Sequence, residues 1–387
     1  MNSERRSAFF EIIRILLVVF ILITICTVVF SSCASDDNPP IEVEDVLLVY
    51  LAGDNNLSGE SHEKFEAIVK GYDGARDRRI LVYLDSKGET PQLIEITDKN
   101  KYQILENYSA ENSADPAVLG RVIAKAKSLY PQADFNFLVF SHATGWLPQG
   151  YYTDPRAVFD TMPSKRSILV DENSEMDLSD FARTIPDNMF EYIIFETCHM
   201  AGVEVVYELR HKAKYIVASS AEIVSPGFTD VYSSNINDLI NGEPTDFIQA
   251  VFDFFNNQTS YMYSATFSII ETSQLENLAT FIRDNCDFTK VIETENIQYF
   301  DRKNFHLFCD FEDYYSRLLE NDQQQKILSQ LVNKCVIWKA STPYFMEGYN
   351  GFFIKKHSGL TAYIMQDRYA NLNTAYEKST WYKAIIK

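Results

Sequence analysis

The sequence has few of the features that indicate a metal-bound or disulfide-stapled protein. Its 387 residues contain six cysteines, and no two of these are spaced as C-x-x-C. The histidines are scattered without metal-ligand spacing, so we expect neither a metal site nor a cofactor. Disulfide bonds among Cys286, Cys309 and Cys335 are compatible with an oxidising compartment. Buried apolar thiols are the alternative.

Positive charge is also scarce. Lys and Arg number 35 against 54 Asp and Glu, which gives a net charge of −19. Nucleic-acid binding needs a basic face, so this balance argues against it. Hydrophobic residues make up 46% of the chain and aromatic residues 14%, enough for a large ordered core. We find no internal repeat and no low-complexity tract.

The N-terminal residues predict export. Arginines precede an uncharged apolar run at 15–30, so residues 1–32 are predicted to be a signal peptide, with a membrane anchor as the rival. Two small residues stand directly before Cys33, which resembles a bacterial lipobox and predicts lipidation of Cys33. Residues 33–44 would then be a lipidated, flexible tether. The expected location is that of an outer-membrane lipoprotein, either periplasmic or exposed at the cell surface.

The remaining chain alternates apolar strands with amphipathic helices. This pattern predicts an α/β fold with a mostly parallel sheet covered by helices on both faces. We assign it to a domain at 45–286, followed by a smaller C-terminal α+β part at 287–387. The expected strands are 46–53, 79–85, 91–97, 135–142, 192–198 and 215–220, and the expected helices are 58–72, 115–131, 177–186 and 202–211.

Polar clusters follow three of the expected strands. They read AGDNN (52–56), SHATGW (141–146) and ETCHMAG (196–202). In open α/β sheets, ligands and chemistry collect beyond the carboxyl ends of the strands. The three clusters are therefore predicted to share one edge of the sheet.

Cys198 and His142 are the reactive residues of these clusters. Cys198 stands between a strand and a helix, where the helix N-terminus is expected to lower the pKa of a thiol. If the two strands are neighbours, His142 faces the same crevice and the pair can perform nucleophilic catalysis. The backbone N–H groups of Ala143 and Cys198 could receive an oxyanion. The alternatives are an inert buried thiol and a structural histidine, and His199 is taken as a structural or pocket-wall residue.

Several stretches together resemble the clostripain family of cysteine peptidases. They are LLVYLAGDNNL, FLVFSHATGW and YIIFETCHMAGVEVVYEL, with SEMDLSDFARTIP and the C-terminal SGLTAYI and LNTAYEKSTWYKAI. The resemblance spans about residues 45–387 and implies a caspase-like fold with a His/Cys dyad. It implies that His142 is the general base or orienting group and that Cys198 is the nucleophile.

Two positions depart from the family pattern. Ala143 replaces the usual Gly after the catalytic His, which would strain the loop if a positive φ were needed. Glu196 replaces the Asp that in the family lines a pocket for Arg or Lys. The resemblance therefore implies substrate binding by Glu196, with Asp54 and Asn55 as the opposite pocket wall. A structural ion pair for Glu196 and turn capping for Asp54 and Asn55 are the alternatives.

The polar segment 143–175 contains a basic pair. Some relatives cut themselves in such a loop, so Lys165 or Arg166 is a candidate self-cleavage site, with an exposed basic turn as the alternative. The function we predict is a lipid-anchored cysteine endopeptidase that cleaves peptide or protein substrates after Arg or Lys. The rivals are a catalytically degenerate binding lipoprotein and a hydrolase or acyltransferase that acts on a non-peptide substrate.

Overall fold

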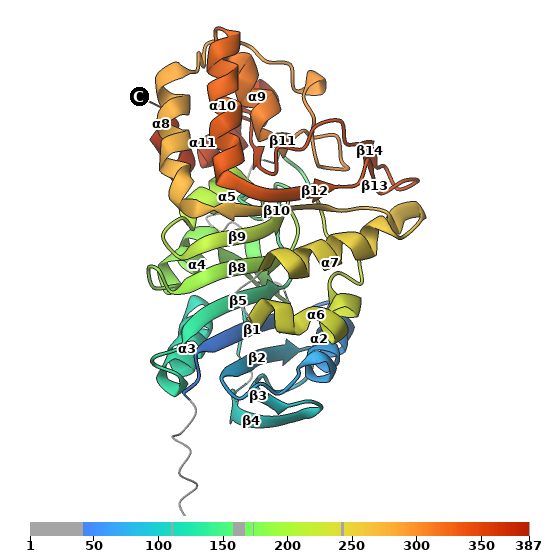
Figure 1. The fold of residues 1–387 in the computed structure, drawn as a ribbon. Coiled ribbons are helices and arrows are strands. Elements are labelled where there is room, and N and C mark those ends of the chain that lie inside the picture. The colour runs from blue at the N-terminus through green and yellow to red at the C-terminus, as the bar shows by residue number, and fades with distance from the viewer. Residues whose placement is uncertain (1–41, 110, 158–166, 173, 241–243, 387) are drawn as a thin grey trace, which may run out of the picture. The chain divides into compact units, whose positions relative to one another are not determined.

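A nine-stranded sheet forms the centre of the chain. The computed structural model describes residues 42–109, 111–157, 167–172, 174–240 and 244–386. In this part the strand order is β12-β10-β9-β8-β5-β1-β2-β3-β4 (Figure 1). The strands are β1 (Asp45–Gly53), β2 (Arg78–Ser86), β3 (Gln92–Asp98), β4 (Lys101–Asn107), β5 (Asp134–Phe140), β8 (Phe190–Glu196), β9 (Ala213–Ser219), β10 (Thr266–Glu271) and β12 (Val336–Ser341).

The middle of the sheet is parallel. Strands β2, β1, β5, β8 and β9 run in one direction and are paired in this order. Both faces are covered, which explains why these strands are continuous apolar runs. In β1, for example, every residue from Val46 to Ala52 has no exposed surface. The predicted mostly parallel sheet is confirmed.

Helices cover the sheet on both sides. One face is covered by α2 (Ser58–Gly71), α6 (Thr229–Ile240) and α7 (Pro244–Asn256). In this group α2 packs on α6, and α6 packs on α7. The second group, α3 (Pro116–Leu129), α4 (Leu178–Thr184) and α5 (Val203–Glu208), likewise packs in sequence, and Figure 1 shows it on the opposite face. Helix α3 begins as its sequence predicts, because Pro116 occupies the first turn and the Asp115 side chain accepts a hydrogen bond from the N–H of Ala117.

Both edges of the sheet are antiparallel. At one edge, β3 pairs with β2, and β4 pairs with β3. Strand β4 was not predicted from the sequence, because its residues are mostly exposed and show no sustained apolar alternation. At the other edge, β12 pairs antiparallel with β10, so a strand from the predicted C-terminal part completes the central sheet.

The rest of the C-terminal part consists of helices and two-residue strands. A buried aromatic cluster joins it to the segment after β5, since the Trp146 ring lies 4.9 Å from the Tyr363 ring and 5.3 Å from the Tyr376 ring. Residues 43–387 form one compact unit, and the domain boundary at 287 stays a prediction. The remaining elements are α8 (Leu275–Asn285), β11 (Cys309–Asp310), α9 (Phe311–Leu318), α10 (Asp322–Cys335), β13 (Tyr344–Phe345), β14 (Phe352–Phe353), β15 (Thr361–Ala362), α11 (Ala370–Tyr376) and α12 (Thr380–Ile385).

Within the polar segment 143–175, a short hairpin forms from β6 (Ser167–Asp171) and β7 (Ser174–Asp177). It is tied to the end of β5, because the backbone N–H of Val170 donates to the Ser141 hydroxyl at 3.0 Å. The hairpin therefore lies beside the segment that carries His142. Among the described residues, no helix is long and apolar enough to cross a membrane.

Candidate active site

Two adjacent parallel strands deliver His142 and Cys198 to the same edge of the sheet. In the pairing of β5 with β8, Phe140 lies opposite Glu196. His142 and Cys198 each follow two residues later, just beyond the carboxyl ends of their strands. The neighbouring strands on which the predicted dyad depended are therefore present.

His142 is held by an asparagine from the cluster after β1. Its Nε2 lies 2.8 Å from the side-chain oxygen of Asn56. Because a carboxamide oxygen only accepts hydrogen bonds, Nε2 carries the proton and Nδ1 keeps a free lone pair. Burial lowers the pKa of His142 below its ordinary value of 6.5, against a smaller opposing effect of Glu60. The ring is therefore neutral at pH 7 and able to accept a proton.

Cys198 lies in a sharp turn rather than at a helix start. Helix α5 begins only at Val203, after Gly202. His199 has a φ of 59°, in the left-handed region that non-glycine residues rarely adopt. Its backbone N–H donates to the carbonyl of Ala221 at 3.0 Å, which fixes the turn. Strain of this kind is concentrated at functional sites.

The thiol is not activated in the way the sequence suggested. The expected helix N-terminus is too far along the chain to act on Cys198, since the dipole effect falls off within the first turn. Burial instead raises the pKa of Cys198 to about 12, although the backbone N–H of Ile223 donates to the sulfur and partly opposes this. The expectation of a lowered thiol pKa was wrong, and at neutral pH the resting group is a thiol.

The replacement of Gly by Ala at 143 causes no backbone strain. Ala143 is buried, and it is not among the described non-glycine residues with positive φ. The left-handed residue of this loop is Gly145, whose φ is 63°. A β-carbon on Gly145 would approach the carbonyl oxygen of His199 to 2.7 Å. The loop thus has a glycine at the position where the backbone requires one. A role of the Ala143 N–H in an oxyanion hole stays a prediction.

Glu196 is buried in an ion pair. Its side chain is 1% exposed, and one carboxylate oxygen lies 2.6 Å from Nζ of Lys64, which has no exposed side-chain surface. The same oxygen accepts from the backbone N–H of Phe228 at 2.6 Å, and the second accepts from the Tyr232 hydroxyl at 2.6 Å. The structure thus supports the ion-pair alternative, because the carboxylate is already neutralised by an internal lysine.

Asp54 and Asn55 follow β1 but serve other contacts. The side chain of Asn55 accepts from the N–H of Leu57 at 2.8 Å and donates to the carbonyl of Val170 at 2.8 Å. It caps the turn and binds the hairpin, as the alternative held. Asp54 lines a cavity of about 370 Å³ with other acidic residues. Neither His142 nor Cys198 is among the residues that line this cavity, and a substrate-binding role for Asp54 stays a prediction.

His199 is a structural residue, as expected. Its side chain is fully buried and stacks on Phe308, with the ring centroids 4.1 Å apart. Its Nδ1 lies 3.3 Å from the carbonyl oxygen of Ser220. Cys198, Cys286, Cys309 and Cys335 are all free, so the described chain has no disulfide between them.

Three polar residues near the predicted dyad were not predicted from the sequence. Asn56 lies in the AGDNN cluster, but its contact with His142 was not predicted. Nothing in the local sequence indicates which turn residue binds a side chain 86 positions away. Lys64 lies on α2 among helix-surface residues and gave no sign of burial. Glu222 follows β9, the parallel neighbour of β8, and the rule that chemistry collects at the carboxyl ends of strands could have identified it.

Several predicted positions lie outside the described residues. These are the signal peptide, the lipidation site Cys33 and the candidate self-cleavage residues Lys165 and Arg166. Within the described residues, no group of three or more His, Cys, Asp or Glu side chains is arranged to hold a metal ion.

Comparison with protein families decides the identity. The model of the clostripain family matches residues 49–380. The chain belongs to the clostripain family. It is thus a member of a family of cysteine proteases, as the resemblance implied. A comparison with curated proteins gives no match.

Solved structures of clostripain-family proteases share the fold. An inactive zymogen C11 protease from Parabacteroides distasonis has 28% identity and a TM-score of 0.77, with 90% of this chain and 99% of that chain covered. A secreted C11 cysteine protease from Bacteroides thetaiotaomicron, in complex with an irreversible peptide inhibitor, has 25% identity and a TM-score of 0.76, with 89% and 99% covered. The caspase-like architecture is thereby confirmed for this chain.

Proposed function

We propose that this clostripain-family protein is a lipid-anchored cysteine endopeptidase with His142 and Cys198 as its catalytic dyad. The observation that carries the proposal is the register of β5 with β8, which brings both residues to the same edge of the sheet. The neutral ring of His142 and the strained turn at His199 support it. The unstrained backbone at Ala143 supports it as well, because strain at this Gly-to-Ala replacement would have favoured a catalytically degenerate site.

The raised thiol pKa determines how the first step runs. His142 accepts the proton of Cys198 as the sulfur attacks the scissile carbonyl carbon, so that no free thiolate accumulates beforehand. The carbonyl oxygen becomes an oxyanion, which the N–H groups of Ala143 and Cys198 receive. When the intermediate collapses, the C–N bond breaks and the leaving amine takes the proton from His142. Water, deprotonated by His142, then attacks the thioester carbonyl carbon. The C–S bond breaks to release the acid product, and His142 returns the proton to the sulfur of Cys198.

Peptide hydrolysis by the full chain tests this proposal. We expect turnover of a fluorogenic peptide series and its complete loss in Cys198→Ala and His142→Ala. Asn56→Ala is the graded control, since it removes only the partner of the His142 ring and should lower kcat by about tenfold or more. Hydrolysis that survives Cys198→Ala would remove the nucleophile assignment. No turnover by a folded wild-type chain would favour a binding protein or an unprocessed zymogen.

A basic P1 preference remains part of the proposal, but Glu196 is not its basis. The Lys64 ion pair leaves that carboxylate without free charge for a substrate cation. The test is the ratio of kcat/KM for peptides that differ only in Arg, Lys or Ala at P1. Equal rates for the three peptides would contradict the preference.

Lipidation and processing complete the proposal. Lipidation is tested by incorporation of an alkyne-labelled fatty acid, which Cys33→Ala should abolish. A relative solved as an inactive zymogen supports activation by cleavage. If Lys165 or Arg166 is the site, the double replacement by Gln should keep the chain intact, whereas cleavage of that variant at the same position would exclude both residues.

A further inference from the structure

We propose that Arg302 occupies, from within the chain, the position where the side chain of a basic P1 residue binds, with Glu222 as the carboxylate that both would share. This inference rests on the proposed function and names a specificity-determining residue for it. It makes Arg302 an internal competitor of the substrate. The Arg302–Glu222 pair would then set the P1 preference that Glu196 cannot provide.

Glu222 stands next to the nucleophile. It follows β9, and the residues on either side of it both contact the turn that carries Cys198. The carbonyl of Ala221 accepts from the N–H of His199 at 3.0 Å, and the backbone N–H of Ile223 donates to the sulfur of Cys198. A carboxylate at this position lies beside the site where the substrate carbonyl must bind.

Glu222 is a charged acceptor with defined geometry. Arg302 Nε lies 3.1 and 3.0 Å from its two oxygens, and a terminal guanidinium nitrogen lies 3.0 Å from the first. The Tyr152 hydroxyl donates to it at 2.9 Å. Burial alone would raise the pKa of Glu222, but His199, Arg302 and Tyr152 together lower it. This forked pairing is the one a guanidinium makes with a carboxylate, and a substrate arginine can reproduce it.

The two partners are accessible enough to exchange. The side chain of Arg302 is 30% exposed and that of Glu222 is 17% exposed. Besides Glu222, Arg302 makes one other described polar contact, a 3.0 Å hydrogen bond to the carbonyl of Tyr349 at an exposed position. Rotation of one side chain is therefore enough to release Glu222, without movement of the backbone.

The loop that presents Arg302 is anchored at its base. The N–H of Phe300 donates to the carbonyl of Phe308 at 2.9 Å, and the buried side chain of Asp301 accepts from the N–H groups of Phe305 and Leu307, both at 2.9 Å. The backbone that carries Arg302 is thus fixed, so only the side chain has to move to release Glu222.

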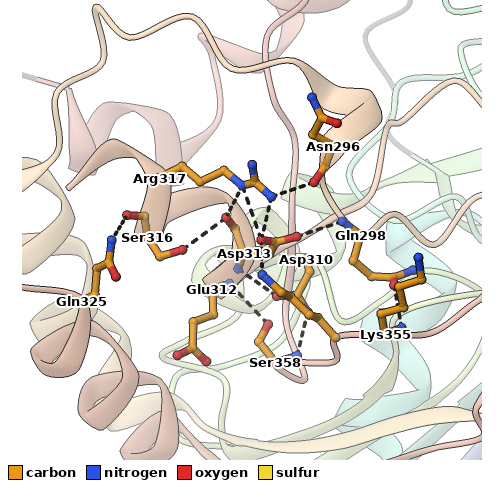
Figure 2. Close-up of polar contacts among 11 residues, drawn as sticks. Asn296, Gln298, Asp310, Glu312, Asp313, Ser316, Arg317, Gln325, Lys355 and Ser358 are labelled. Carbon is orange, nitrogen blue, oxygen red and sulfur yellow. Dashed lines mark hydrogen bonds and ion pairs between the residues drawn. The ribbon is translucent and has the colours of Figure 1, made fainter. Parts of the chain in front are cut away.

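A polar network ties together three segments of the C-terminal part. Figure 2 shows Asp313 accepting from the backbone N–H of Gln298 at 3.0 Å and pairing with Arg317 at 3.2 Å. It also shows Asp310 accepting from the N–H of Ser358 at 2.6 Å. The network fixes the chain on both sides of the Arg302 loop, at Gln298 and at Asp310, which supports the fixed placement of Arg302.

The deciding measurement is P1 selectivity in the full chain. We expect Arg302→Gln to raise the kcat/KM ratio of Arg to Ala peptides at least tenfold, and Glu222→Gln added to it to abolish the gain. Lys355→Gln is the control, because it removes an exposed cation of the same C-terminal part that has no described contact with Arg302, Glu222 or Tyr152, and it should leave the ratio unchanged. A ratio in Arg302→Gln within twofold of the wild type would overturn the inference, even while Cys198-dependent hydrolysis of the peptides upholds the proposed function.

Binding of a small guanidinium compound provides a readout that needs no turnover. Agmatine titrated calorimetrically should bind Arg302→Gln at least tenfold more tightly than the wild type, and should not bind the double variant. Equal binding to all three proteins would contradict the inference. If no variant hydrolyses any peptide, this titration still decides on Arg302, while the proposed function fails separately. Thermal unfolding of each variant identifies any that is misfolded.

Discussion

Two ion pairs lie near Cys198, and they differ in how far their side chains are exposed to solvent. Lys64 and Glu196 are 0% and 1% exposed, whereas Arg302 and Glu222 are 30% and 17% exposed. Lys64 also donates to the carbonyl of Pro226 at 2.9 Å and lies over the ring of Phe140. The first pair is part of the core, and the second lies at its border with solvent.

The difference shows how a charge near an active site can be assigned a role. A buried charge that loses its partner is left uncompensated, so such a pair has to persist throughout the catalytic cycle. A partly exposed pair exchanges one partner for another at little cost, because water compensates both charges in between. We therefore assign Lys64–Glu196 to structure and Glu222 to substrate recognition.

Breaking the buried pair should give the largest effect. Lys64→Met leaves the carboxylate of Glu196 buried without a cation, and we expect the free energy of unfolding to fall by about 3–5 kcal/mol. Urea unfolding measures this loss. Adding Glu196→Leu removes the orphaned charge and should recover most of the stability. If Lys64→Met were as stable as the wild type, the Lys64–Glu196 ion pair would not be a buried pair in solution.

A buried acid with no cationic partner among the described residues sharpens the comparison. Asp85 is 2% exposed, and burial followed by repulsion from Asp171 raises its pKa to about 7. The folded state therefore holds a proton that the unfolded state releases above about pH 4. The free energy of unfolding should fall by at most about 1.4 kcal/mol per unit as pH rises from 4 to 7, and then level off. Asp85→Asn should flatten this slope, and an unchanged slope would assign it to other groups.

The thiol offers a kinetic test of the site between the pairs. With a pKa raised to about 12, the thiolate fraction of Cys198 grows about tenfold per pH unit through neutral pH. The rate of alkylation by iodoacetamide should follow this increase up to at least pH 9. His142→Ala should leave the slope in place. A plateau below pH 7 would instead indicate a preformed thiolate–imidazolium pair.

Breaking the partly exposed Arg302–Glu222 pair should have the smallest effect on stability. Arg302→Gln is expected to change the free energy of unfolding by less than about 1 kcal/mol, because solvent replaces the lost partner of Glu222. Urea unfolding beside Lys64→Met gives the comparison directly. Similar losses in the two variants would contradict the distinction between the pairs.

The regular parts of the fold could be predicted because they depend on local patterns. The parallel strands are continuous apolar runs, and α3 has its proline and its capping aspartate in sequence order. The strand β4 and the hairpin β6–β7 were missed, since neither has a strong apolar alternation and both are defined by their partners.

The site was predictable to the same extent. His142 and Cys198 follow recognisable strands, so their position at the same edge of the sheet could be expected from the strand pattern. The ion pair of Glu196 could not be predicted, because its cation, Lys64, lies on a helix 132 positions away in the sequence. In the sequence, Lys64 cannot be told from an exposed lysine. The thiol pKa was mispredicted for a related reason, since it depends on how deeply the finished fold buries the sulfur.

The order in which the chain is made bears on when the nucleophile turn can form. Ala201, three residues after Cys198, accepts a 2.9 Å hydrogen bond from the N–H of Thr361, and Gly202 forms a bridge with the same residue. A chain that emerges from its N-terminus cannot make these contacts until Thr361 has been synthesised, 163 residues after Cys198. Contacts between such distant residues form late in folding. The reactive turn is therefore incomplete until the segment that contains Thr361 has been made and has packed against Ala201 and Gly202.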